Sequence, residues 1–232
     1  ISMNILVINP TSESELNDTI FQAADQASKL SARSAEEYTH TSAISLDQAP
    51  RRVASPLEIM EASMALMEKV RSLKDVYDGF IIAHTAELGA DALQELTGKP
   101  VVSSGAAAVY SAPLYGHRIA VLSRSLRDLE THRETLRHYG ILHDNLTFLP
   151  VMEENAPLAD LREAVSEAAE KAKKEHLATV LVLGDPSMGV LADDVSRLTH
   201  LPVLEGITSA LIRIEYMVYQ QERLREHAAK RT

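Results

Sequence analysis

The chain has 232 residues, enough for one large α/β domain or for two small lobes that share a core. Its net charge of −10 argues against a nucleic-acid-binding surface, which needs a basic stripe, and the lack of cysteine excludes disulfides, thiolate metal sites and thiol nucleophiles. Because no apolar run reaches about 18 residues and no signal peptide is recognisable, we expect a cytoplasmic protein that neither crosses a membrane nor is secreted.

The first half of the chain alternates strands with helices. The opening strand runs into the loop Asn9 to Ser12, where Pro10 cannot continue a sheet ladder and Thr11 or Ser12 can cap the helix that follows. A later apolar run, FIIA, reads as a buried strand of a parallel sheet, followed by a polar loop led by His84 and Thr85. We expect strands at 5–8, 36–44, 80–83 and 100–102, with helices after residue 12, at 57–73 and at about 89–98.

The second half of the chain repeats the first. HRIAVLSRS corresponds to NILVINPTS, and TVLVLGDPSMGVLADD corresponds to the stretch around GFIIAHTAELG. This internal duplication places His84 and Asp185 at matching strand ends of two similar lobes. We expect strands at 117–125, 147–151, 180–183 and 203–204, with helices at 126–139, at 157–176 and at 207–231.

This alternation predicts an α/β fold of two pseudo-symmetric lobes, each a parallel sheet flanked by helices. The boundaries we expect are residues 3–104 plus 206–232 for the first lobe and 105–205 for the second. In such sheets ligands bind beyond the carboxyl ends of the strands, so the site should lie in a cleft between the lobes. The candidate residues at strand ends are Asn9, Thr11, Ser12, His84, Thr85, Ser103, Ser104, Ser123, Arg124, Asp185, Pro186, Ser187 and Glu205.

Several common motifs are missing. Gly184 and Gly189 are not followed by the Lys-Ser/Thr pair of a phosphate-binding loop, and neither GxGxxG nor GxSxG occurs at a suitable place. No HxxxH or HExxH pair falls on an expected helix, so we expect no metal centre. Taken singly, His84 could be an ordinary buried histidine, and Asp185-Pro186 could be only a turn. Their matched positions in the duplicated frame favour a catalytic role for both.

A series of short motifs in fixed order resembles one family. The motifs ILVINPTS, GFIIAH, KPVVSSGAAA, HRIAVLS, VLVLGDPSMGVL and LPVLEGITSAL resemble the aspartate/glutamate/hydantoin racemase superfamily, and within it the hydantoin and allantoin racemase branch. The resemblance covers almost the whole chain. It implies two pseudo-symmetric α/β lobes with the site in their cleft, no cofactor, and proton transfer by two cysteines. In this sequence His84 and Asp185 stand at the positions of those two cysteines.

The replacement changes the expected chemistry. Two thiols form a symmetric pair, whereas unperturbed imidazole and carboxylate, with pKa values of about 6.5 and 3.9, are two bases at neutral pH. The leading hypothesis is proton transfer at a carbon next to a carbonyl of a small carboxylate or cyclic ureide, with His84 as base or acid and Asp185 opposite or orienting it. Ring opening, decarboxylation or elimination in the same cleft remains an alternative, as does a catalytically silent ligand-binding protein.

Two further expectations concern binding. Substrate oxygens should contact Thr11, Ser12, Thr85, Ser187 and nearby backbone amides, and Ser123 and Arg124 could complete that pocket. A helix face of Leu57, Met60, Met64, Met67 and Val70 indicates either core packing or a subunit contact, and together with the family resemblance it predicts a homo-oligomer.

Overall fold

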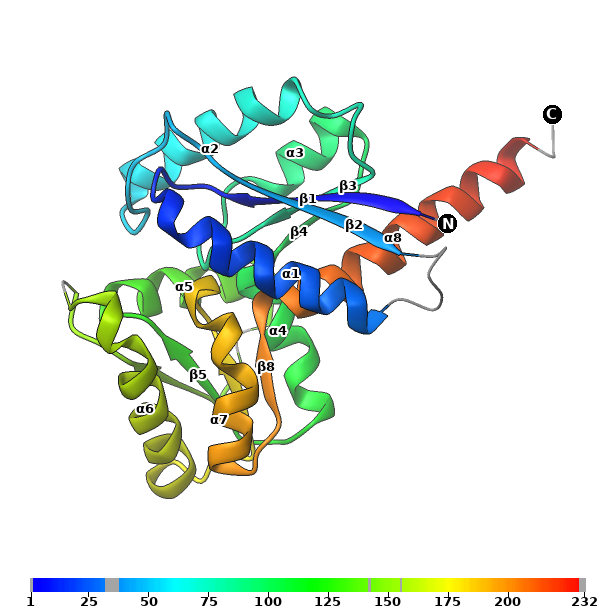
Figure 1. The fold of residues 1–232 in the computed structure, drawn as a ribbon. Helices are drawn as coiled ribbons and strands as arrows, with labels where there is room; N and C mark the ends of the chain where they lie inside the picture. Colours follow the sequence, from blue (N-terminus) through cyan, green and yellow to red (C-terminus); the bar gives the residue numbers. More distant parts are fainter. Residues whose placement is uncertain (1, 32–37, 142, 155, 230–232) are drawn as a thin grey trace.

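The computed structural model describes residues 2–31, 38–141, 143–154 and 156–229. It contains two four-stranded parallel sheets, with strand orders β2-β1-β3-β4 and β6-β5-β7-β8. The sheets form the centres of two lobes, one above the other in Figure 1. The first sheet comprises β1 (Met3–Asn9), β2 (Thr39–Ser45), β3 (Gly79–Ile82) and β4 (Val101–Ser103), and the second comprises β5 (Ile119–Ser123), β6 (Leu146–Pro150), β7 (Val180–Leu183) and β8 (Val203–Glu205).

Helices flank both sheets. In Figure 1, α2 and α3 lie with the first sheet, α5, α6 and α7 with the second, and α8 leaves the second sheet to run along the first lobe. The α-helices are α1 (Asn17–Ser31), α2 (Pro56–Arg71), α3 (Ala90–Thr97), α4 (Ser104–Ser111), α5 (Leu126–His138), α6 (Leu161–Glu175), α7 (Ala192–Thr199) and α8 (Gly206–Ala229). None of the helices in the described part of the chain has the length and apolarity needed to cross a bilayer.

The two sheets share one topology and one register. In the first sheet Ile5 pairs with Gly79, and in the second Ile119 pairs with Val180. Counting from these pairs, His84 and Asp185 occupy equivalent positions, two residues after β3 and β7. We call the loop around His84 after β3 and the loop around Asp185 after β7 the first and second twin strand ends. The duplicated α/β architecture predicted from the sequence is therefore confirmed.

Each central strand is buried on both faces, which explains its uninterrupted apolar sequence. In β1, Ile5 and Val7 pack with α1 and α8, whereas Leu6 and Ile8 pack with α2 and α3. In the second lobe, alternate residues of β5 and β7 likewise face α6 and α7 on one side and α4 and α5 on the other. The period of two in side-chain direction thus divides each lobe into two core layers.

Helix α8 belongs to the core of the first lobe. Its residues Leu211 and Ile214 join the same buried cluster as Ile5 and Val7 of β1. A Cβ at Gly79 would lie 2.8 Å from Cδ1 of Ile214, so the glycine allows this close approach. The residue boundaries of the two lobes stay a prediction, because α4 contributes side chains to the cores of both.

The start of α1 differs from the expected one. The sequence predicts Thr11 or Ser12 as the cap of the helix after β1, but a 3-10 turn (Ser14–Leu16) intervenes and α1 begins at Asn17. The Thr11 hydroxyl instead accepts the backbone N–H of Glu13, at 3.2 Å, and donates to Oδ1 of Asn9, at 2.8 Å. Thr11 therefore closes a tight turn at the strand end. The expected strand at 36–44 is found from Thr39, and its first two positions lie outside the described residues.

The predicted apolar face of α2 is exposed in its first half, whereas Met67 is partly buried and Val70 is buried. Met60 and Met64 are 64% and 68% exposed, while the helix buries Ala62, Leu66 and Val70 against the sheet. Core packing is therefore the wrong interpretation for these two methionines, because the buried stripe follows the 62, 66, 70 spacing of one helix face. A subunit contact on this face, and the homo-oligomer, stay predictions.

Candidate active site

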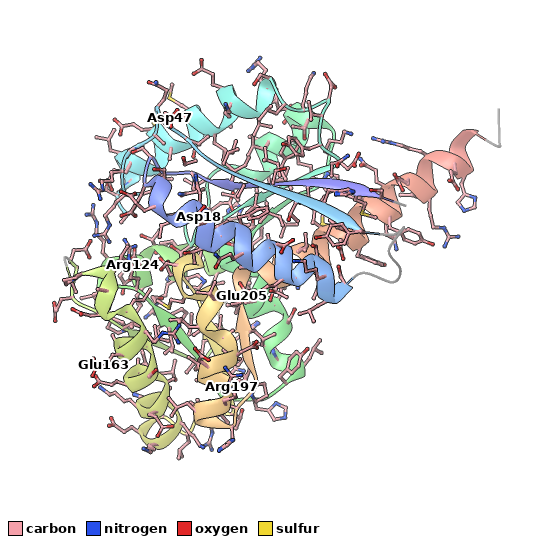
Figure 2. The ribbon with its side chains drawn as sticks, in the orientation of Figure 1. Asp18, Asp47, Arg124, Glu163, Arg197 and Glu205 are labelled. Carbon is pink, nitrogen blue, oxygen red and sulfur yellow. The ribbon has the colours of Figure 1, made fainter. Side chains whose placement is uncertain are left out.

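A small polar pocket lies between the lobes and brings both twin strand ends together. Seven of its side chains are charged or titratable, and they come from loops and helix starts of both lobes. In Figure 2, Arg124 is labelled on the part of the second lobe that faces the first. The lining residues are Asn9, Thr11, Glu13, Leu16, Ile20, Arg51, Arg52, Val53, Ala83, His84, Arg124, Asp128, Asp185 and Pro186.

His84 is partly buried and held in one tautomer. Its Nδ1 lies 2.9 Å from the backbone N–H of Ala86, and since that N–H can only donate, Nδ1 accepts. The neutral ring therefore carries its proton on Nε2, which has no hydrogen-bond partner among the described residues. Burial lowers the pKa of His84 to about 4; Asp185 opposes this effect, and Arg124 adds to it. At neutral pH His84 is an uncharged imidazole with one free N–H donor.

Asp185 occupies the equivalent turn as an anion. Its Oδ1 accepts the backbone N–H of Ser187 at 2.9 Å and the Ser187 hydroxyl at 2.5 Å. Burial alone would raise the pKa of Asp185, but Arg124, the Ser187 hydrogen bonds and His84 together hold it below its usual value. Within the described part of the chain Oδ2 makes no hydrogen bond. The site thus contains one ionised carboxylate with a free basic oxygen.

Arg124 supplies positive charge with unused donors. Its side chain is only 14% exposed, and its nearest carboxylate oxygen, Oδ2 of Asp128, lies 3.8 Å from Nε. Burial would lower its pKa, but Asp185 and Asp128 raise it, so the guanidinium stays charged. None of its N–H groups makes a hydrogen bond to another described residue. Those donors are available to an oxygen of a bound molecule.

Asp128 and Arg52 connect the two lobes beside this pocket. The guanidinium of Arg52, from the loop before α2, lies 3.6 Å from Asp128 and 3.2 Å from the Glu154 carboxylate, and it donates to the Glu154 carbonyl at 2.8 Å. Burial and the neighbouring Asp185 raise the pKa of Asp128. A further interlobe ion pair joins Arg127 to Glu58 at 3.3 Å.

The pocket is nearly closed. Its cavity volume is about 30 Å³, whereas sites that bury a drug-sized ligand measure roughly 300–1,000 Å³. A substrate therefore enters only if the lobes or the loop that carries Arg52 move apart. Motion of the loop must break the Arg52 contacts to the second lobe, and separation of the lobes must also break the Arg127–Glu58 ion pair.

The other predicted site residues fall into two groups. Asn9, Thr11 and Pro186 line the pocket with His84, Asp185 and Arg124, whereas the remaining seven do not, and most of these seven have other contacts. Those contacts are the Ser12 N–H to the Pro50 carbonyl at 3.1 Å, the Thr85 carbonyl to the Thr135 hydroxyl at 2.7 Å, the Ser104 hydroxyl to the His84 carbonyl at 3.4 Å, and the Ser187 bonds to Asp185. Glu205 caps α8, and the buried hydroxyls of Ser103 and Ser123 have no partner among the described residues.

Four charged lining residues were not among the predicted site residues: Glu13, Arg51, Arg52 and Asp128. Asp128 lies three residues after Ser125, whose hydroxyl accepts the Asp128 backbone N–H, so its spacing indicates a helix N-terminus and nothing more. From the sequence alone, Arg51 and Arg52 can lie either over a site or in solvent. The sequence signal that could have indicated these residues is the number of charged side chains in the loops beside the expected cleft.

Comparison with known proteins identifies the family of this chain. A sequence model described as Asp/Glu/hydantoin racemase matches residues 5–213. The chain belongs to the Asp/Glu/hydantoin racemase family. It is 29% identical to a hydantoin racemase from Paenarthrobacter aurescens over 93% of this chain and 91% of that protein.

Solved structures of this family have the same fold. The allantoin racemase from Klebsiella pneumoniae superimposes with a TM-score of 0.81 at 27% identity, covering 94% of this chain and 89% of that one. The allantoin racemase from Pseudomonas fluorescens gives a TM-score of 0.80 at 25% identity, covering 94% and 92%. The protein is thus an enzyme of the isomerase and racemase type. Since it contains no cysteine, its proton transfers cannot use a thiol pair.

Proposed function

We propose that this racemase-family enzyme moves a proton at a carbon next to a carbonyl of a small cyclic ureide or carboxylate, with Asp185 as the base and His84 as the donor. The supporting observation is that the two side chains line one pocket, where Arg124 and the Ser187 hydrogen bonds hold the pKa of Asp185 below its usual value and burial lowers the pKa of His84 to about 4. The hydantoin and allantoin racemases among its relatives favour a cyclic ureide as substrate.

In this proposal Asp185 Oδ2 takes the proton from the carbon. Abstraction next to a carbonyl moves negative charge onto the carbonyl oxygen, and Arg124 can stabilise that oxygen with its unused N–H donors. His84, from the other twin strand end, donates a hydrogen bond from its Nε2–H to the enolate oxygen and keeps its proton. Inversion results when a water molecule gives the carbon a proton on the face opposite Asp185, and the hydroxide left behind takes the proton held by Asp185.

One experiment tests the proposal. Single enantiomers of allantoin and of a hydantoin substituted at the ring carbon next to a carbonyl are incubated with the enzyme in deuterated water. We expect optical rotation to decay while that carbon gains deuterium, faster than in enzyme-free samples, and with no other change of mass. Stable optical rotation without deuterium gain for every compound tested would contradict the proposal.

The chemical difference between His84 and Asp185 favours a second candidate function. An ionised carboxylate beside a fixed neutral donor is also suited to one-directional chemistry, such as water activation for ring opening, decarboxylation or elimination. The same incubation separates the two, because hydrolysis or cleavage yields products of different mass. A ligand that raises the thermal midpoint without any product would indicate instead a catalytically silent descendant.

A further inference from the structure

His132 of α5 lies beneath the first twin strand end. Its ring is 1% exposed, and its Nε2 lies 2.5 Å from the carbonyl oxygen of Gly105. Because a carbonyl only accepts, this nitrogen carries the ring proton. The Gly105 N–H in turn donates to the carbonyl of His84 at 3.0 Å. The imidazole is therefore connected through Gly105 to the backbone of His84.

The same ring contacts the second twin strand end. A Cβ at Gly184, the residue before Asp185, would lie 2.8 Å from both Nδ1 and Cε1 of His132. Glycine at this position therefore leaves the space that the ring occupies. The equivalent residue of the first strand end, Ala83, has a side chain.

A second side chain of α5 extends this contact. Thr135, three residues after His132, donates its hydroxyl to the carbonyl of Thr85 at 2.7 Å. Helix α5 of the second lobe thus hydrogen-bonds the loop that carries His84 of the first lobe, while His132 packs against the strand end that carries Asp185.

Core packing alone does not account for an imidazole here. Nδ1 of His132 is buried and has no hydrogen-bond partner among the described residues. A buried polar atom without a partner costs free energy that an apolar side chain would not. Two properties of His132 remain that an apolar side chain would lack or share only in part. Its Nε2–H donates to the Gly105 carbonyl, and its flat ring fits against Gly184.

From these contacts we propose that His132, supported by Thr135, is a positioning residue that fixes the separation of His84 and Asp185 across the pocket. It touches neither substrate nor reacting atoms. The inference rests on the proposed roles of His84 and Asp185. It predicts that the α5 side chains that contact the first lobe affect the rate of turnover.

The test compares His132→Leu with His132→Gln. Leucine fills the space without a donor, whereas the glutamine amide can reach the Gly105 carbonyl. We expect His132→Leu to lower kcat about 10- to 100-fold, because small misplacements of reacting groups are costly, with KM close to wild type. His132→Gln should recover most of kcat. The matched control is His138→Gln on the same helix, a half-exposed histidine, which should leave both constants unchanged.

A second readout does not depend on turnover. Nuclear magnetic resonance titration of the His84 ring, assigned with His84→Asn, should give a pKa of about 4 in the wild type, where Asp185, Arg124, His132 and Arg52 surround it. We expect the His84 pKa to rise toward its ordinary value in His132→Leu, as the loop loosens, and to stay low in His132→Gln. Should the leucine variant not fold, Thr135→Val is expected to produce a smaller shift in the same direction.

The outcomes distinguish the two proposals. Wild-type kcat and an unchanged His84 titration in the leucine variant would overturn the positioning role, as would a glutamine variant that is equally impaired. A wild-type enzyme without turnover on any compound would instead count against the proposed function, while the titration would still decide the role of His132.

Discussion

The two twin strand ends share one side-chain hydrogen bond, but one holds a neutral imidazole and the other an ionised carboxylate. After β3, Nδ1 of His84 accepts the N–H of Ala86, two residues further on, at 2.9 Å. After β7, Oδ1 of Asp185 accepts the N–H of Ser187, also two residues further on, at 2.9 Å. The same hydrogen bond therefore occurs in both lobes, while the residue that accepts it differs.

One hydrogen bond has different consequences at the two ends. A backbone N–H stabilises whichever form of the side chain keeps a lone pair toward it, which is the neutral form for imidazole and the ionised form for a carboxylate. Both pKa values are lowered, that of His84 by burial and that of Asp185, against the effect of burial, by Arg124 and the Ser187 hydrogen bonds. A pair of thiols can exchange the roles of acid and base, whereas this pair has fixed roles. The comparison thus predicts Asp185 as the base and His84 as the donor.

Removing the base should have the largest effect. Asp185→Asn keeps an Oδ1 acceptor for the Ser187 N–H and nearly the same volume, but no basic oxygen. We expect kcat to fall by about 10²–10⁴, the usual contribution of a general base. The measurement is the rate of deuterium incorporation in deuterated water, with circular dichroism to verify the fold. Undiminished exchange would remove Asp185 from the mechanism.

The matched variant at the other end is His84→Asn. Its side-chain oxygen can accept the Ala86 N–H, so the turn is kept while the Nε2–H donor is lost. Loss of a donor to a developing oxyanion costs about 10²–10³ in kcat. If this variant were impaired far more than Asp185→Asn, the roles assigned to the two residues would have to be reversed.

Much of the fold could be predicted because the strands are buried on both faces. Apolar runs such as IIA after Phe80 and VLVL at β7 predict buried strands without tertiary information. The internal repeat shows that these two strands are equivalent in the two lobes. The start of α1 could not be predicted, because Asn9 binds the Thr11 N–H and the chain continues into a 3-10 turn. Side chains that bond to their own local backbone compete with helix capping, and sequence does not show which prevails.

The site was predictable only where it coincides with the strand ends. His84 and Asp185 follow strands of the duplicated frame, so the rule for parallel sheets places them at one edge. Arg52 and Asp128 reach the pocket from a loop and from a helix start in different lobes, and their proximity depends on how the lobes pack. Nothing local in the sequence encodes that contact.

The depressed pKa of His84 also predicts a pH-dependent stability. In the unfolded chain His84 gains a proton below about pH 6.5, whereas the folded imidazole resists protonation until about pH 4. The free energy of unfolding should therefore fall as pH decreases from 6.5 to 4, with His84 contributing up to about 3 kcal/mol. His132, whose pKa burial also lowers, acts in the same direction.

Urea unfolding at several pH values between 7 and 4 tests this prediction. His84→Asn should lose less stability on acidification than the wild type, because it lacks the titrating group. Asp128 and Glu205, whose pKa values burial raises, act in the opposite direction in both proteins and so cancel in the difference. Equal pH dependence in the two proteins would contradict a buried, neutral His84.

The smallest expected effect concerns Glu205, a strand-end residue that was a candidate for substrate binding. Its two carboxylate oxygens accept the backbone N–H groups of Ile207 and Thr208, at 2.6 and 2.5 Å, where α8 begins. Glu205→Ala should therefore lower the free energy of unfolding by about 1–2 kcal/mol, as loss of a helix cap does, and leave kcat near the wild-type value. Glu205→Gln, which keeps one acceptor oxygen, should be intermediate in urea unfolding. A large loss of kcat at unchanged stability would return Glu205 to the substrate site and show that the end of β8 takes part in catalysis like the twin ends of β3 and β7.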